Sequence, residues 1–187
     1  RYSRVLARSV SGSRSSTSAS EQATPSITAR VSAPRSWWAA RPVKEPRRAA
    51  LGLLHELLGD EAFHRTELRP IAALSDSERV TLKAMLARRL NSPLCSSMGR
   101  LFDAVASLAG LRQETRFEGQ AAMELEFALD DTITDETYDF SLLTRGSPLV
   151  LDWSPMIEGI LSDCRSGVSI AQISAKFHNA LAEAVVR

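Results

Sequence analysis

The chain has 187 residues, of which 44% are hydrophobic and 24% charged, and its formal net charge is +1. This length and composition are typical of one soluble globular domain, and they exclude a small scaffold held together by disulfides. No stretch of the sequence approaches the ~20 apolar residues that a membrane helix needs, so a membrane-spanning role is excluded too.

The small net charge hides two unlike segments. Residues 1–44 carry eight Lys or Arg against the single acid Glu21, a charge of +7, whereas residues 45–187 carry fifteen against twenty-one, a charge of −6. The first segment is rich in serine and has no sustained apolar periodicity, so it cannot bury enough surface to offset its chain entropy. We therefore predict a disordered Ser/Arg-rich tract over residues 1–43 and a domain over residues 44–187.

Three interpretations of residues 1–43 stay open. An Arg- and Ser-rich, acid-poor start resembles an organellar transit peptide, but Arg1 is not an initiator methionine and we expect the chain to be a fragment. A basic tail with the stacking pair Trp37-Trp38 would suit nucleic acid, yet one aromatic pair is weak evidence and we expect no such partner. The third interpretation is a frame error or false junction that ends near Arg41–Val43.

The first predicted helix enters through Pro46 and ends near Gly59, because Ala50, Leu54 and Leu58 fall on one face. A second helix begins at a capping box formed by Ser75 and Glu78 and stops before Pro93. Its buried stripe consists of Leu82, Met85, Leu86 and Leu90.

A third helix has two different faces and ends near Gly110. Leu101, Val105 and Leu108 form the apolar face, while the other carries small residues and one carboxylate, namely Ser96, Gly99, Asp103 and Ala106. A carboxylate beside a glycine can accept a hydrogen bond from a ribose hydroxyl. The spacing alone favours the simpler interpretation, a solvated helix face.

The next predicted helix has Glu118, Ala122, Leu125 and Leu129 on one stripe, with Gly119 in its first turn. Free backbone N–H groups there would suit a phosphate or ribose, although a lone glycine more commonly marks a turn. A β-hairpin follows, formed by Thr137–Leu143 and Pro148–Asp152 around Arg145-Gly146.

Two helices end the chain, one over residues 155–165 and a long final one. Ile170, Ile173, Phe177, Leu181 and Ala184 lie on one face of the latter, which runs to Arg187 without a stop signal, so we expect the last element to be cut off. The predicted fold class is mainly α with a small β-hairpin.

Metal and thiol chemistry are not predicted. Cys95 and Cys164 lie far apart without CxxC spacing, which favours neither a zinc ribbon nor a disulfide framework and indicates a reducing compartment, the cytoplasm. His55, His64 and His178 form neither HxxxH nor HExxH, so we predict no metal ligand.

Three strings in chain order resemble one family. They are NSPLCSSMGRLFDAVA (91–106), FEGQAAMELE (117–126) and FHNALA (177–182), and they resemble the C-terminal region of the hydrogenase maturation carbamoyltransferase HypF. The segment EPRRAAL (45–51) resembles the approach to that region, so the likeness covers residues 42–187. Family members more commonly have Thr where Cys95 stands, which argues against a catalytic thiol.

The resemblance implies a reaction and its partners. The family makes carbamoyl-adenylate from carbamoyl phosphate and ATP and transfers the carbamoyl group to the C-terminal cysteine of HypE in NiFe hydrogenase maturation. Its C-terminal region is similar to the threonylcarbamoyl-transfer domain, an actin-like ATPase fold, of which residues 44–187 would be part. A HypE-type protein and carbamoyl phosphate are then the expected partners, and the fragment alone would be inactive.

The resemblance also implies nucleotide-binding residues. Asp103 and Gly119 occupy the positions of nucleotide contacts in the related domain, and Gly99 and Glu118 lie nearby in the motifs. The family's divalent metal is held by an upstream His-x-x-x-His motif and a downstream Asp, and its zinc lies in an upstream domain. Neither set of ligands occurs in this sequence, so no catalytic or metal residue is assigned.

Two other functions stay open. One is a stand-alone helical interaction module, and the other is an enzyme of the threonylcarbamoyl or O-carbamoyl transfer type. The string Phe-Glu-Gly-Gln-Ala-Ala from Phe117, in place of a Tyr-Pro-Gly-Gly-like turn, favours HypF over the latter.

Overall fold

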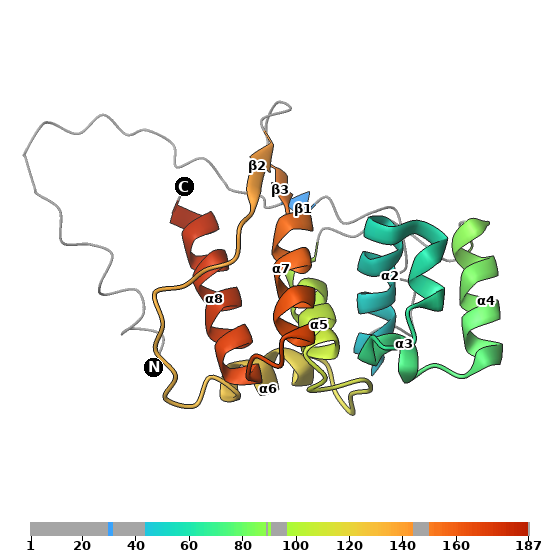
Figure 1. Cartoon of the computed structure of the whole chain (residues 1–187), viewed down its shortest axis with the longest axis horizontal. Helices are drawn as coiled ribbons and strands as arrows, with labels where there is room; N and C mark the ends of the chain where they lie inside the picture. Colours follow the sequence, from blue (N-terminus) through green and yellow to red (C-terminus); the bar gives the residue numbers. More distant parts are fainter. Residues whose placement is uncertain (1–29, 32–43, 89, 91–96, 144–149, 187) are drawn as a thin grey trace, which may run out of the picture.

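The computed structural model describes residues 30–31, 44–88, 90, 97–143 and 150–186. Most of them lie in helices, with a small sheet at one end of the helical array (Figure 1). The fold class predicted from the sequence, mainly α with a β-hairpin, is confirmed. The elements in chain order are β1 (Arg30–Val31), α2 (Pro46–Leu58), the 3-10 helix η2 (Gly59–His64), α3 (Arg69–Ala72), α4 (Asp76–Ala87), α5 (Met98–Leu108), α6 (Gln120–Phe127), β2 (Ser141–Leu143), β3 (Val150–Asp152), α7 (Ser154–Arg165) and α8 (Ile170–Val186).

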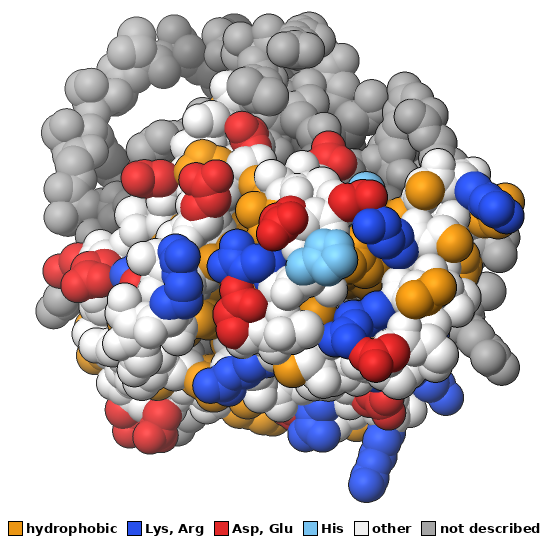
Figure 2. All heavy atoms as spheres, turned by 45° about the vertical axis from the view of Figure 1, so that its right-hand side comes forward, with side chains coloured by type: hydrophobic (Ala, Val, Ile, Leu, Met, Phe, Trp, Pro, Cys, Tyr) orange, Lys and Arg blue, Asp and Glu red, His pale blue; other side chains and the backbone are white. Residues whose placement is uncertain are grey.

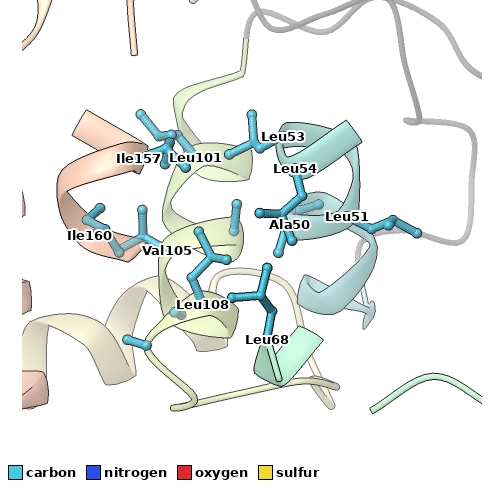
Figure 3. Close-up of a cluster of buried hydrophobic side chains, with 14 of the residues drawn as sticks. Ala50, Leu51, Leu53, Leu54, Leu68, Leu101, Val105, Leu108, Ile157 and Ile160 are labelled. Carbon is cyan, nitrogen blue, oxygen red and sulfur yellow. The ribbon is translucent and has the colours of Figure 1, made fainter. Parts of the chain in front are cut away.

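Helix α5 is the centre of the core. In Figure 3 it lies between α2 and α7, with Leu54 on one side, Ile160 on the other and Val105 between them. All three side chains are fully buried, and the core around them combines Leu, Ile and Ala with aromatic residues such as Trp153 and Phe177. Because α5 is covered on several sides, the polar residues that it carries are drawn into the interior.

Helices α2 and α4 are joined through Arg47. As predicted, Ser75 and Glu78 form a capping box at the start of α4, in which Ser75 N–H donates to Glu78 Oε2 at 2.8 Å. Arg47 on α2 is only 9% exposed, and its Nη2 donates to Glu78 Oε1 at 2.9 Å. The residue that caps α4 thus also pairs with a buried cation on α2.

Charges of both signs alternate on the face of the molecule near these helices. Figure 2 shows Lys and Arg side chains lying beside Asp and Glu side chains there, with apolar side chains between them. Between α4 and η2, Lys83 Nζ lies 3.0 Å from Asp60 Oδ2. This face therefore presents paired charges and no field of a single sign.

The strands confirm the predicted hairpin and add one strand. Strand β2 pairs antiparallel with β3, and the connection at residues 144–149 lies outside the described residues. Strand β1 pairs parallel with β3, with Arg30 opposite Val150. The disorder predicted for residues 1–43 stays a prediction, because the structure describes only residues 30–31 of that tract. Strand β1 was not predicted, since a two-residue pairing depends on main-chain groups that leave no pattern in the sequence. The rest of residues 1–43 lies outside the description.

The C-terminal half is tied together by a buried tyrosine. The segment after α6 runs along α8 to the sheet (Figure 1), and Tyr138 in it donates a hydrogen bond to Asp163 Oδ2 of α7 at 2.7 Å. Lys176 of α8 donates to the same oxygen at 2.8 Å. Helices α7 and α8 match the two predicted final helices. Among the described residues, no helix is long and apolar enough to cross a membrane.

Replacing Leu54 by Ala tests the central place of the α2–α5 contact. We expect the free energy of unfolding to fall by about 2–5 kcal/mol, because a fully buried leucine leaves a cavity. Urea denaturation followed by circular dichroism measures this change. Val80→Ala on α4, at a side chain that is 71% exposed, is the control and should change it by less than ~0.5 kcal/mol. Equal effects of the two substitutions would contradict this core.

Candidate nucleotide site

The central feature of the site is the carboxylate of Asp103 in the middle of α5. The residue is only 6% exposed, because α5 packs through its neighbours Leu101 and Val105. Ala106, on the same small-residue face, is fully buried. The sequence favoured a solvated face here, and this was wrong at Asp103 and Ala106, which are both buried. A carboxylate in that position loses most of its hydration and needs partners.

One partner of Asp103 comes from its own helix. Arg100 lies three residues earlier, and its Nη1 donates to Asp103 Oδ2 at 2.7 Å. Among the described residues, this is the hydrogen bond seen at the carboxylate, and it uses Oδ2. The carboxylate is therefore held by Arg100 through one of its two oxygens.

The environment of Asp103 makes the carboxylate harder to ionise than usual. Burial raises the pKa of Asp103, the Arg100 guanidinium lowers it, and the negative charge of Glu118 raises it again, so that the pKa lies above its ordinary value. Glu118 itself is exposed. The structure thus brings two of the predicted residues, Asp103 and Glu118, within electrostatic reach of each other.

Gly119 is the N-cap of α6. Its φ is +81°, in the left-handed region that favours glycine, and a Cβ there would have no neighbour within 4 Å. The residue therefore precedes the helix, whereas the sequence placed it in the first turn. Helix α6 starts at Gln120, so Glu118 also lies outside it, and the N–H groups of the first turn begin directly after the glycine.

A carboxylate missed by the sequence reasoning, Glu124, secures the start of α6. Arg112 binds it with two hydrogen bonds, from Nε at 2.7 Å and from Nη2 at 2.6 Å. Gln120 Nε2 donates to the same carboxylate at 2.8 Å. The hydrogen bonds from Arg112 lower the pKa of Glu124 below its ordinary value. No local pattern could reveal this pair, because twelve residues and a loop separate its members.

The fourth predicted residue, Gly99, lies one helical turn before Asp103. It is exposed near the start of α5, and a Cβ there would meet only Ser97 Oγ at 3.6 Å, an ordinary contact. The structure therefore shows no packing need for glycine at this position. Ser96, the next residue of that face, lies outside the described residues.

The described residues offer no metal site. No group of three or more His, Cys, Asp or Glu side chains among them could hold an ion. They therefore do not fit the divalent metal or the zinc that the family resemblance implies. The thiol of Cys164 is half-buried, and burial raises its pKa above the ordinary value, whereas Cys95 lies outside the description.

Comparison with known proteins identifies the family. Residues 33–187 match the family described as "Carbamoyltransferase, Kae1-like Domain, second subdomain". The chain belongs to the HypF carbamoyltransferase family. The resemblance in the three sequence strings is thereby confirmed, and the match begins within the tract at residues 1–43.

The similar proteins are much longer than this chain. Carbamoyltransferase HypF of Synechocystis is 35% identical over 156 residues, which cover 77% of this chain and 20% of that protein. HypF of Rhizobium leguminosarum is 34% identical over 134 residues, which cover 65% of this chain and 17% of the relative. This chain thus spans about one fifth of these HypF proteins.

A solved structure has the same fold. A crystal structure of full-length HypF, described as its phosphate- and nucleotide-bound form, superposes with a TM-score of 0.67 and 33% sequence identity. The similarity covers 78% of this chain and 22% of that one. The described residues therefore have the fold of one region of HypF, the Kae1-like domain.

Two substitutions should shift the pKa of Asp103 in opposite directions. Arg100→Gln removes a stabilising positive charge and should raise it further, whereas Glu118→Gln removes a negative charge and should lower it. Carbon-13 NMR titration of the Asp103 carboxyl measures both shifts. Arg79→Gln, at an arginine that pairs with Asp76, is the matched control and should leave the pKa of Asp103 unchanged. Shifts of the same sign in both variants would disprove this electrostatic arrangement.

Proposed function

We propose that this chain supplies one wall of the nucleotide site in a HypF carbamoyltransferase, with Asp103 accepting a hydrogen bond from a ribose hydroxyl of ATP. The observation that carries the proposal is the state of the carboxylate: it is desolvated and held by Arg100 through one of its two oxygens. A ribose hydroxyl is a neutral donor that suits such an acceptor.

The start of α6 supports the same proposal. Gly119 precedes the first turn of α6, where the N–H of Gln120 donates to Phe117 O and the next N–H groups have no acceptor within the helix. Glu118 lies within electrostatic reach of Asp103. We assign Gly119 to a backbone contact with the nucleotide, and Glu118 and Gly99 to its surroundings. Glu124 and Arg112 hold α6 in place beside it.

For the complete protein we propose the reaction of its family. Carbamoyl phosphate and ATP would give carbamoyl-adenylate, and the carbamoyl group would pass to the C-terminal cysteine of a HypE-type protein during NiFe hydrogenase maturation, in the cytoplasm. In this reaction the described residues would position the nucleotide. Positioning of the reactants raises the rate of acyl transfer when no protein nucleophile takes part. No step is assigned to the family's metals, because the described residues do not hold them.

The two alternatives have less support. The family match over residues 33–187 covers most of the chain, which does not favour an unrelated helical interaction module. The relatives of Synechocystis and Rhizobium leguminosarum carry the name carbamoyltransferase HypF, which favours that family over a threonylcarbamoyl or O-carbamoyl transferase.

Asp103→Ala in a full-length family protein that carries this sequence tests the proposal. We expect the affinity for ATP to fall roughly 10- to 100-fold, because a hydrogen bond to a charged group contributes about 1.5–3 kcal/mol. Carbamoyl transfer should fall with it. Isothermal titration with ATP and an assay of carbamoylated HypE-type protein measure the two effects.

The matched control is Asp131→Ala, at an exposed acid just after α6, which should change neither quantity. Circular dichroism checks that both variants are folded. Unchanged ATP affinity and turnover in folded Asp103→Ala protein would remove Asp103 from the nucleotide site.

A further inference from the structure

A hollow of about 260 Å³ lies between the connection from η2 to α3, the end of α5 and the last turn of α7. Its floor is apolar, since Leu68 and Leu108 line it and are 7% and 3% exposed. Leu108 lies five residues beyond Asp103, more than one turn further along α5. None of the candidate nucleotide-site residues lines the hollow.

The rim of the hollow carries more positive than negative charge. Arg69 and Arg165 line it together with a single acid, Glu67. Glu67 is already paired with Arg65. The hydrogen bond from Arg65 lowers the pKa of Glu67, and the charge of Arg165 lowers it further. The one carboxylate of the rim thus interacts with the guanidinium groups of Arg65 and Arg165, and Arg69 adds a further positive charge.

Neither arginine on the rim uses its full hydrogen-bonding capacity. Arg69 Nη1 donates to Ala109 O at 3.1 Å, and Arg165 Nε donates to Leu161 O at 3.2 Å. These bonds cap the C-terminal ends of α5 and α7. A guanidinium has five N–H donors. Within the described part of the chain, each of these arginines makes one such bond, so donors remain on both.

The side chain of Arg69 lies against the backbone of Gly110. Gly110 has a φ of +81°, and a Cβ there would come within 1.9 Å of Arg69 Nη1. The side chain thus lies directly against the glycine, in space that no other residue would leave open. A cation held in this way loses little conformational freedom when it binds an anion.

We propose that this hollow binds a small organic anion: a carboxylate paired with Arg69 and Arg165, joined to a compact apolar group that rests on Leu68 and Leu108. Guanidinium groups favour carboxylates because their fork of N–H donors matches two oxygens. The volume is slightly below the ~300–1,000 Å³ of sites for drug-sized ligands, which limits the occupant to a smaller molecule. This inference does not depend on the proposed nucleotide site.

NMR titration of the 187-residue chain tests the inference, with benzoate as the probe and benzyl alcohol as its neutral analogue. Benzoate should cause saturable shifts at Leu161 and Cys164, which line the hollow. Benzyl alcohol should bind at least about tenfold more weakly, because it cannot pair with the guanidinium groups. No saturable shift with benzoate, or equal affinity for the two probes, would overturn the proposal.

Substitutions then identify the groups responsible. Arg165→Gln should weaken benzoate about tenfold or more and leave the weak binding of benzyl alcohol unchanged. Arg69→Gln should do the same, and Arg69→Lys, which keeps the charge, should retain part of the affinity even if Arg69→Gln fails to fold. Arg79→Gln on α4, away from the hollow, is the control and should bind benzoate normally. Unchanged benzoate affinity in folded Arg165→Gln protein would also overturn the proposal.

Discussion

The packing of α5 between α2 and α7 is the constraint on which the rest of the structure depends. Through Leu101 and Val105 it forms the core shown in Figure 3, and the same packing draws Asp103 out of water. An unpaired buried carboxylate would be costly, and Arg100 offsets that cost from the same helix. A helix buried for packing reasons thus carries a polar group suited to binding.

Further polar contacts hold the surrounding elements against α5. Arg47 links α2 to the capping box of α4, while the pair Arg112 and Glu124 holds the loop after α5 against α6. At the other end of α5, Arg69 caps the helix through Ala109 O and reaches the hollow beside α7. Each of these arginines donates a hydrogen bond to a specific carbonyl or carboxylate oxygen. These bonds link the elements that surround α5.

Most of the helices could be predicted from the sequence because their signals are local. Pro46 at the start of α2 and the capping box at Ser75 lie within one helical turn of the residues that they affect, and the structure confirms both. The short helix α3 escaped prediction because four residues are too few to show an apolar period. Strand β1 escaped because its pairing depends on the distant β3.

In the candidate site too, residues within local motifs could be predicted, whereas contacts between distant segments could not. Asp103 and Gly119 were found through motifs that resemble a family, and family membership is now established, while their contacts with nucleotide stay predictions. The burial of Asp103 was missed because it depends on how α5 is covered by distant elements. The bond from Arg112 to Glu124 was missed for the same reason, since it spans a loop.

The most direct measurement is a crystal structure, with ADP bound, of a full-length HypF-family protein that contains this sequence. We predict that a ribose hydroxyl lies within hydrogen-bond distance of Asp103 Oδ1, about 2.5–3.0 Å, while Arg100 stays on Oδ2. An ADP molecule bound away from α5, with no ribose contact to Asp103, would contradict it.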